Sequence, residues 1–316
     1  MTGGGTSISV VMPVHNGGHD LDEALASIFS QTFGEFELIA VDDHSTDETP
    51  SRLRRAAEED PRVRVITPPG RGFVAAVNAG IAASQADWIA RMDADDRSHP
   101  DRLTRQMAHL RAHPDLDVLG TAVRVIDAGG SPTGTIRYPL DHSLITLSLR
   151  AATAFAHGTV IVRREALAAV GGYRSERFPV EDYDLWCRLV VAGARMANLD
   201  EPLYDYRLSA GGVSRTVTER QQSMATEVGI EYGRLLPSVP GAGEAWRAAG
   251  AIARQVADGE ADPRALARAG RSTRESILPW VRSRRWGGAG AALAGAFRAE
   301  AAYRRRPLTV ARFRRP

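Results

Sequence analysis

Short apolar segments of β-type composition alternate with segments of helical period over residues 8–126, and this alternation constrains the fold more than any other feature. Helices are predicted to begin at Asp20, Asp47, Phe73 and Pro100, the first with Asp20 and Glu23 as a capping box. The predicted strands are Ile8–Val14, Phe36–Val41, Arg62–Ile66, Trp88–Met92 and Leu116–Ile126, the last being one strand or a pair. Because strands that alternate with helices usually run parallel, the chain is predicted to be an α/β protein with a mostly parallel sheet flanked by helices.

Polar loops follow the first, second and fourth of these strands. The loops are His15-Asn16, Asp42-Asp43 and Asp93-Ala94-Asp95-Asp96. In open α/β sheets, ligands bind at the carboxyl ends of the strands. We therefore expect the three loops to form one binding site.

The sequence Asp93-Ala94-Asp95-Asp96 has two interpretations. Carboxylates crowded on one loop repel one another unless a cation joins them, and hard oxygen ligands suit Mg²⁺ or Mn²⁺. The alternative is an Asp-rich turn that leads into the helix at Pro100. The tetrapeptide alone favours neither.

Three other polar segments also have a structural and a functional interpretation. Asp42-Asp43 suits a turn or helix cap, or an acceptor for a nucleobase N–H group. Glu181-Asp182 suits the start of a helix, where acids are favoured by the helix dipole, or a general base kept ionised by that dipole. His157, which precedes a predicted strand at Val160–Val162, suits a structural hydrogen bond or a substrate contact.

The C-terminal part of the chain differs in composition from the rest. From about Thr216 the sequence is helical and rich in Ala and Arg, so we predict a first domain over residues 1–215 and a helical region over residues 216–316. Residues 270–316 hold twelve Arg and two acids, with aromatic residues between them, whereas the remainder carries a net charge of −8. Three interpretations of this tail are open: a solvated helix, a means of docking on an anionic membrane surface or a phosphate-bearing lipid acceptor, and a segment that binds nucleic acid.

The sequence also predicts the cellular compartment. Cys187 is the lone cysteine, which excludes an internal disulfide and fits a reducing environment. The N-terminal residues lack the charged and apolar regions of a signal peptide, and the apolar stretch Trp286–Phe297 is too short to span a bilayer. A cytoplasmic protein is predicted, either free or peripheral on the inner face of the membrane.

Four segments in order resemble the motif set of the family 2 glycosyltransferases, over about residues 7–210. They are Ile8–Asn16, Val41–Thr49, Ala90–Asp96 and Glu181–Trp186. The resemblance implies a GT-A-type fold, a nucleotide-sugar donor, Mn²⁺ or Mg²⁺, and inversion of the anomeric centre. It also implies an acceptor hydroxyl on a glycan or a lipid-linked molecule, in the synthesis of a cell-surface polysaccharide, glycolipid or glycoconjugate.

The resemblance assigns roles to the residues at the matching positions. Asp95 would be the more direct metal ligand of a DxD-type pair with Asp93, and Asp182 the catalytic base, with Glu181 and Asp184 as the next candidates. The residues implied to bind the nucleotide-sugar are Pro13, Val14, His15, Asn16, Asp42 (to the base), Asp43 (supporting the loop), Arg71, Asn78, Asp93 and His157. His15 and His44 depart from the commonest family pattern, and His44 leaves the geometry of its turn open.

Two other classes of protein fit this sequence less well. A sugar-nucleotide pyrophosphorylase needs a Gly-rich phosphate loop with basic residues after the first strand, and no Arg lies near Pro13–Gly18. A non-catalytic module that binds nucleotide-sugars or carbohydrate would not need Asp95 and Asp182 together. Nothing in residues 1–215 calls for a nucleic-acid partner.

Overall fold

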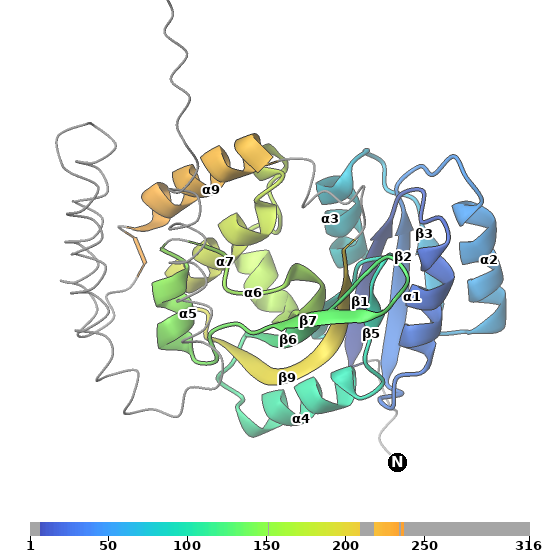
Figure 1. Ribbon diagram of the computed structural model, residues 1–316, viewed down its shortest axis with the longest axis horizontal. Helices are drawn as coiled ribbons and strands as arrows, with labels where there is room; N and C mark the ends of the chain where they lie inside the picture. Colours follow the sequence, from blue (N-terminus) through green and yellow to red (C-terminus); the bar gives the residue numbers. More distant parts are fainter. Residues whose placement is uncertain (1–6, 151, 209–217, 234, 237–316) are drawn as a thin grey trace, which may run out of the picture.

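A computed structural model describes residues 7–150, 152–208, 218–233 and 235–236. The strands within these residues form one nine-stranded sheet in the order β3-β2-β1-β4-β8-β6-β9-β5, with β7 paired to β6 (Figure 1). Helices flank the sheet. The predicted α/β class is confirmed.

The first half of the sheet is parallel. It consists of β1 (Ile8–Val14), β2 (Phe36–Asp42), β3 (Val63–Ile66) and β4 (Trp88–Arg91). The strands are connected through α1 (Asp20–Phe29), α2 (Thr49–Glu59) and α3 (Phe73–Ala83). These bounds agree with the predicted elements to within two residues, because each helix lies between two apolar runs that become strands of the same parallel half.

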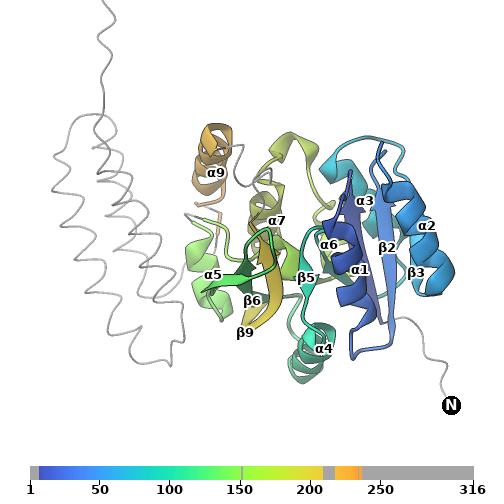
Figure 2. The same ribbon diagram turned by 45° about the vertical axis from the view of Figure 1, so that its right-hand side comes forward.

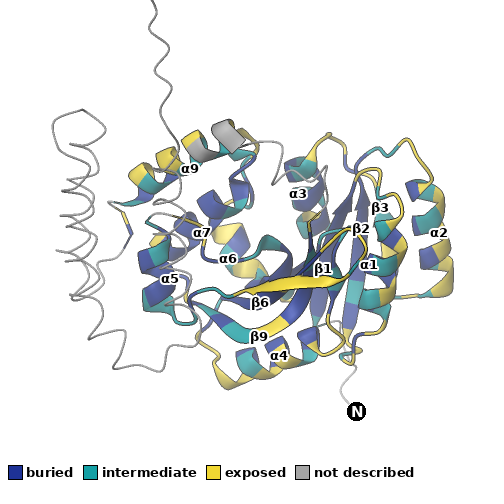
Figure 3. Ribbon diagram, in the orientation of Figure 1, coloured by how far each residue is buried: buried dark blue, intermediate teal, exposed yellow. Residues whose placement is uncertain are grey.

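Both faces of β1 are buried, which explains why its sequence is a continuous apolar run rather than an alternating one. Val11 packs in one core with Val74 and Val77 of α3. Val10 packs on the opposite face, in a second core with Leu21 of α1. Figure 3 shows β1 as buried along its length, whereas β7 (Pro132–Ile136) is exposed. The central strand is therefore held between two helical layers.

The second half of the sheet is mixed. β8 (Ile161–Arg163) runs antiparallel to both β4 and β6 (Val118–Ile126), and β6 runs parallel to β9 (Met196–Arg207). β5 (Arg97–Ser98) and β7 are antiparallel to their neighbours. The mostly parallel arrangement thus holds for the half where helices alternate with strands, and the turn between β6 and β7 forces antiparallel pairing.

The remaining helices cover the second half and one edge of the first. They are α4 (Arg102–Ala112), α5 (His142–Ser148), α6 (Arg164–Ala169), α7 (Glu181–Val191) and α9 (Thr218–Gly233), with 3₁₀ helices η1 (His157–Thr159) and η2 (Ser175–Arg177). Two predicted helices begin two residues later than expected, at Thr49 and Arg102. The capping box predicted for α1 is wrong: His19 occupies the N-cap and makes no side-chain cap bond, while Glu23 binds Arg207 instead.

α9 lies beside α7 in both ribbon views (Figures 1 and 2), and Tyr232 Oη donates to Asp184 Oδ1 at 3.1 Å. Val228 and Tyr232 are buried in the same core as Trp186 of α7. The division near residue 215 stays a prediction, but α9 packs directly on the first domain. None of the described helices is long and apolar enough to cross a membrane, and the Arg-rich residues 270–316 lie outside the described residues.

Candidate active site

The loops after β1 and β2 are fastened to each other. His15 Nδ1 lies 2.8 Å from the Asp43 carbonyl, and the Thr46 N–H donates to Asn16 Oδ1 at 2.8 Å. Asn16 has a φ of 51°, a left-handed conformation that Asn tolerates better than most residues. Both His15 and Asn16 are exposed, whereas Pro13 and Val14 are buried at the end of β1.

Asp42 and Asp43 are both 8% exposed, but they hold different segments. Asp42 Oδ1 accepts a hydrogen bond from the Ser45 N–H at 3.0 Å, which closes the turn after β2. Both carboxylate oxygens of Asp43 accept from the Gly72 N–H, at 3.0 and 2.9 Å. Because Gly72 has a φ of 96°, its left-handed backbone favours glycine. Asp43 thereby ties the exposed Arg71 segment to the same loops.

The loop after β4 carries the three predicted acids. Asp93 and Asp95 are partly exposed, and the Asp93 N–H donates to Tyr204 Oη at 3.0 Å. A Cβ atom at Gly158 would clash with Tyr204 Oη and lie 2.9 Å from Asp93 Oδ2. The His157–Gly158 segment therefore lies directly against Asp93, which is why glycine occurs there.

Charge crowding is evident at Asp95 and Asp96. Burial, followed by repulsion from Asp93, raises the pKa of Asp95 to about 6. Burial also raises the pKa of Asp96 well above its usual range, and this residue is 1% exposed. Asp96 Oδ1 accepts from the Arg207 N–H at 2.7 Å, so Asp96 holds the loop rather than facing solvent.

The donor set fits a divalent cation that is shared with a phosphate. No group of three or more His, Cys, Asp or Glu side chains within the described residues could hold a metal ion without other ligands. Mg²⁺ and similar cations usually bind through one or two carboxylates together with substrate phosphates. Asp93 and Asp95 supply two partly exposed carboxylates, and a cation would relieve the repulsion between them.

Glu181 and Asp182 open α7. Asp182 Oδ1 accepts from the Tyr183 N–H at 2.7 Å, and burial raises the pKa of Asp182 to about 6 although this bond opposes the shift. Asp93 and Arg91 also act on that pKa, which locates Asp182 in the same charged cluster. Burial, then Asp182, raises the pKa of Glu181 to about 8. At neutral pH Asp182 is thus ionised beside a protonated Glu181.

Asp184 is excluded as an alternative base. It is fully buried, Arg188 Nε lies 2.7 Å from its Oδ2, and Tyr232 of α9 donates to its Oδ1. A carboxylate committed to a buried ion pair cannot reach an acceptor hydroxyl. Asp184 serves the packing of α7 against α9.

His157 and Asn78 meet at Tyr173. His157 Nε2 lies 2.8 Å from Tyr173 Oη, and the His157 ring packs edge-on against Phe73 with centroids 5.8 Å apart. Loss of solvation, and then Arg91, lowers the pKa of His157 well below its usual range, so the ring is neutral. Both polar atoms of the Asn78 amide bond the backbone of Tyr173, at 2.8 and 3.0 Å. Asn78 therefore braces the turn that presents Tyr173.

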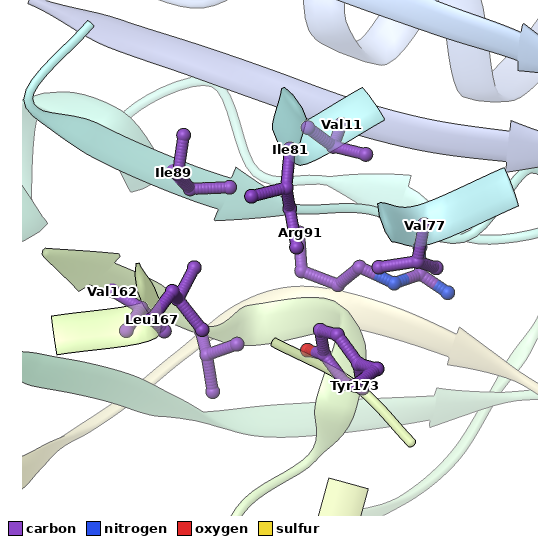
Figure 4. Close-up of a pocket in the computed structure, with 9 residues that line it drawn as sticks. Val11, Val77, Ile81, Ile89, Arg91, Val162, Leu167 and Tyr173 are labelled. Atoms are coloured by element: carbon purple, nitrogen blue, oxygen red, sulfur yellow. The ribbon is translucent and has the colours of Figure 1, made fainter. Parts of the chain in front are cut away.

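Sequence reasoning missed Arg91, which is 3% exposed and is the last residue of β4. Its stem crosses a small apolar pocket between Val11, Val77 and Tyr173 (Figure 4). Its guanidinium lies 5.0 Å from the Phe73 ring centroid and pairs with Asp93. The apolar lining suits an arginine stem rather than a sugar. The available signal was a lone arginine at the end of an apolar strand, just before the acids.

Tyr204 and Arg207 were missed because no strand was predicted over the residues of β9. Both are buried and contact the loop after β4. The signal was weak, since the acids and Pro202 within β9 break its apolar pattern.

Comparison with known proteins agrees with this geometry. The model of glycosyl transferase family 2 matches residues 9–171. The O-antigen biosynthesis glycosyltransferase WbnJ of Escherichia coli is 34% identical over 204 residues, covering 64% of this chain and 79% of that protein.

Two solved structures share the fold. TarS 1–349 of S. aureus in complex with UDP-GlcNAc superposes with a TM-score of 0.60 at 20% identity, covering 73% of this chain and 70% of that chain. The mannosyltransferase PcManGT of Pyrobaculum calidifontis, in complex with GDP-Man and Mn²⁺, gives a TM-score of 0.52 at 16% identity and covers 95% and 88%. The predicted GT-A-type fold is confirmed. With the family model matching more than half of its length, this chain belongs to glycosyl transferase family 2 and is a glycosyltransferase.

Proposed function

We propose that this glycosyltransferase takes a sugar from a nucleotide-diphosphate sugar and transfers it, with metal assistance and inversion, to an acceptor hydroxyl. The observation that carries the proposal is the position of Asp182. Asp182 lies in the first turn of α7, and Trp186 of this helix packs against His157 with ring centroids 6.2 Å apart. The next residue, Gly158, lies against Asp93, so the candidate base and the candidate metal pair are proposed to serve one site.

The nucleotide is proposed to bind across the loops after β1 and β2. His15 and Asn16 are exposed there, and Asp42 is the proposed acceptor for a base N–H. Asp43 supports the same surface through Gly72 and so sets the position of Arg71. The nucleotide-sugar complexes of TarS and PcManGT, which share this fold, support a donor of that class. Pro13 and Val14 are proposed to shape the floor of this pocket through their backbone, since their side chains are buried.

Asp95, together with Asp93, is proposed to hold Mn²⁺ or Mg²⁺. A divalent cation bound there would neutralise negative charge on the departing nucleoside diphosphate, as a Lewis acid. Asp95 is the first choice because Arg91 already pairs with one oxygen of Asp93. The Mn²⁺ in the PcManGT complex supports a metal of this kind.

Asp182 is proposed to accept the proton of the acceptor hydroxyl as that oxygen attacks the anomeric carbon. The bond between the anomeric carbon and the diphosphate oxygen breaks on the opposite side, so the configuration inverts. Retention by double displacement would need a second carboxylate as a nucleophile. Glu181 is protonated at neutral pH, and Asp184 is buried in ion pairs, so neither is suited to that role.

The acceptor is proposed to be a glycan or lipid-linked hydroxyl in the synthesis of a surface polysaccharide or glycoconjugate. The similarity to an O-antigen biosynthesis enzyme supports this assignment. We propose a cytoplasmic enzyme, with the Arg-rich residues 270–316 offering a means of peripheral attachment to the inner face of the membrane.

The decisive experiment screens a panel of UDP-, GDP-, CDP- and dTDP-sugars by thermal shift, with and without MnCl₂. A true donor raises Tm in proportion to the logarithm of its concentration above Kd, and more so with metal. The product formed from that donor is then examined by NMR, and an inverted anomeric configuration is expected. Retention would refute the mechanism, whereas metal-dependent binding without transfer or donor hydrolysis would indicate a non-catalytic module.

A further inference from the structure

Arg207, the last residue of β9, joins three segments that meet beside the proposed metal pair. Its side chain is 2% exposed. Nε donates to the Asp95 carbonyl at 2.8 Å, Nη2 donates to Glu23 Oε2 at 2.6 Å, and Nη1 donates to the Ala128 carbonyl at 3.1 Å. The Arg207 N–H also donates to Asp96 Oδ1 at 2.7 Å.

These contacts connect the loop after β4 with α1 and with the turn between β6 and β7. Asp95 and Asp96 belong to the loop after β4, and Glu23 belongs to the first turn of α1, which follows the His15–Gly18 loop directly. Ala128 lies in the turn between β6 and β7. One buried guanidinium therefore fixes the acid loop against the helix that carries the proposed nucleotide loop.

The acids around Arg207 require a cation at this position. Asp20 Oδ1 lies 3.5 Å from Arg207 Nε, so acids of α1 and acids of the loop after β4 approach the same cation. Without it, these like charges would push the two elements apart. A planar guanidinium can bond a carboxylate and two carbonyls at once, whereas an ammonium on a flexible stem presents donors from a single point.

We propose that Arg207 is a positioning residue for the metal pair: it sets the distance between the carboxylates of Asp93 and Asp95 and the nucleotide-binding loops. This inference rests on the proposed metal-assisted function. Outer residues that orient metal ligands typically contribute about 10–100-fold to metal affinity. Loss of the planar guanidinium should therefore weaken metal binding much more than nucleotide binding.

The test compares Arg207→Lys with a matched control, Arg97→Lys. Arg97 also approaches Glu23, at 3.7 Å, bonds the Gly130 carbonyl at 2.9 Å and pairs with Asp205 at 3.3 Å, so its guanidinium binds α1, β9 and the turn between β6 and β7 rather than the Asp95 carbonyl. The nucleoside diphosphate that stabilises wild type most is chosen from UDP, GDP, CDP and dTDP. Mn²⁺ affinity is then measured by electron paramagnetic resonance at saturating nucleotide, and nucleotide affinity is measured by calorimetry without metal.

Arg207→Lys is expected to raise the Mn²⁺ Kd at least about 10-fold and to change the metal-free nucleotide Kd less than about threefold. Arg97→Lys is expected to change neither. If Arg207→Lys binds Mn²⁺ like wild type, or if both variants weaken metal and nucleotide alike, the inference is wrong while the proposed function stands. If wild type binds no Mn²⁺ with any nucleotide, the proposed metal assistance fails first, and the inference fails with it.

If Arg207→Lys does not fold, the Glu23→Gln variant tests the inference instead. This variant keeps Arg207 and its bond to the Asp95 carbonyl but weakens the anchor on α1. A smaller rise in Mn²⁺ Kd, with an unchanged nucleotide Kd, is expected. An unchanged Mn²⁺ Kd in this folded variant would overturn the inference.

Discussion

Arg91 Nη2 lies 2.5 Å from Asp93 Oδ1, and this ion pair sits at the point where β4 leaves the sheet. The arginine is buried and the aspartate is partly exposed, so the pair connects the core with the site. Arg91 also acts on the pKa values of Asp95, Asp182 and His157. One buried cation at the end of β4 therefore acts on two acids and a histidine that come from three segments of the chain.

Asp95→Ala is expected to reduce sugar transfer to background and to abolish nucleotide-dependent Mn²⁺ binding, because the remaining pair member Asp93 is already bonded to Arg91. Turnover and Mn²⁺ affinity are measured together. Asp115→Asn is the control, since Asp115 is an exposed carboxylate paired with Arg195. Full activity of Asp95→Ala, or of wild type in excess EDTA, would contradict the assignment.

Asp182→Asn is expected to lower kcat by about 10²–10⁴-fold, the usual range for a general base, with little change in donor affinity. The amide keeps the shape of the side chain but cannot accept the acceptor's proton. Rapid-quench turnover and calorimetric donor binding separate the two effects. A kcat close to that of wild type would transfer the role to another group, with Glu181 as the remaining candidate in α7.

The pH dependence of turnover follows from the same residue. Because the pKa of Asp182 is about 6, the base is ionised above that pH and protonated below it. At saturating donor, acceptor and Mn²⁺, kcat should be level above about pH 7 and fall about tenfold per pH unit below about pH 6. Saturating metal keeps Asp95, whose pKa is also about 6, in its ionised form. A kcat that is flat through pH 6, or that rises as pH falls, is the contrary result.

Glu181 should make the protein less stable as pH rises. The folded protein holds its proton up to about pH 8, whereas the unfolded chain releases it near 4.5. Stability is thus greatest below pH 4.5 for this group, and falls between 4.5 and 8 by at most about 1.4 kcal/mol per pH unit. Urea unfolding from pH 5 to 8 should show this slope in wild type and a weaker slope in Glu181→Gln. Equal slopes in the two proteins would be inconsistent with a buried, protonated Glu181.

The parallel half of the fold could be predicted from sequence because β1 and β2 are apolar runs buried on both faces and a helix follows each of the first three strands. β1 and α3 were predicted to the residue. β9 was not predicted, because acids and a proline interrupt its apolar pattern and it forms a strand by pairing with β6 and β5, which are distant in the chain.

The same distinction applies to the site. The acids of the strand-end loops can be recognised in the sequence as clusters of carboxylates, and so can Glu181-Asp182. The sequence does not reveal the contacts of three other residues of the site. Tyr204 and Arg207 bond the acid loop from a distant strand, and the burial of Arg91 beside Asp93 depends on the folded core. Asn78 was predicted to approach the donor, and its bonds to Tyr173 come from a turn 95 residues away, which no local pattern reveals.

Removal of residues 270–316 is expected to abolish binding to vesicles that contain anionic lipid. Twelve arginines with interleaved aromatic residues lie in this region, and each basic residue near an anionic leaflet contributes about 1 kcal/mol. Co-sedimentation compares the full chain with a chain ending at residue 269, which retains α9 and its contact with Asp184. Binding should weaken with salt. If both chains sediment equally with the vesicles, residues 270–316 do not mediate membrane binding. If the tail is only a solvated helix, neither chain binds the vesicles.

Gly158 limits how the donor preference of this enzyme can be redesigned. Even a methyl group there would press on Tyr204 and Asp93 at once, so a mutant library that varies position 158 would mostly sample damaged acid loops. Arg71 is exposed on the segment that Asp43 holds, whereas His15 and Asn16 bond the loop after β2 and Asn16 has a left-handed backbone. Directed evolution toward a new sugar nucleotide should keep position 158 constant and diversify position 71 before positions 15 and 16.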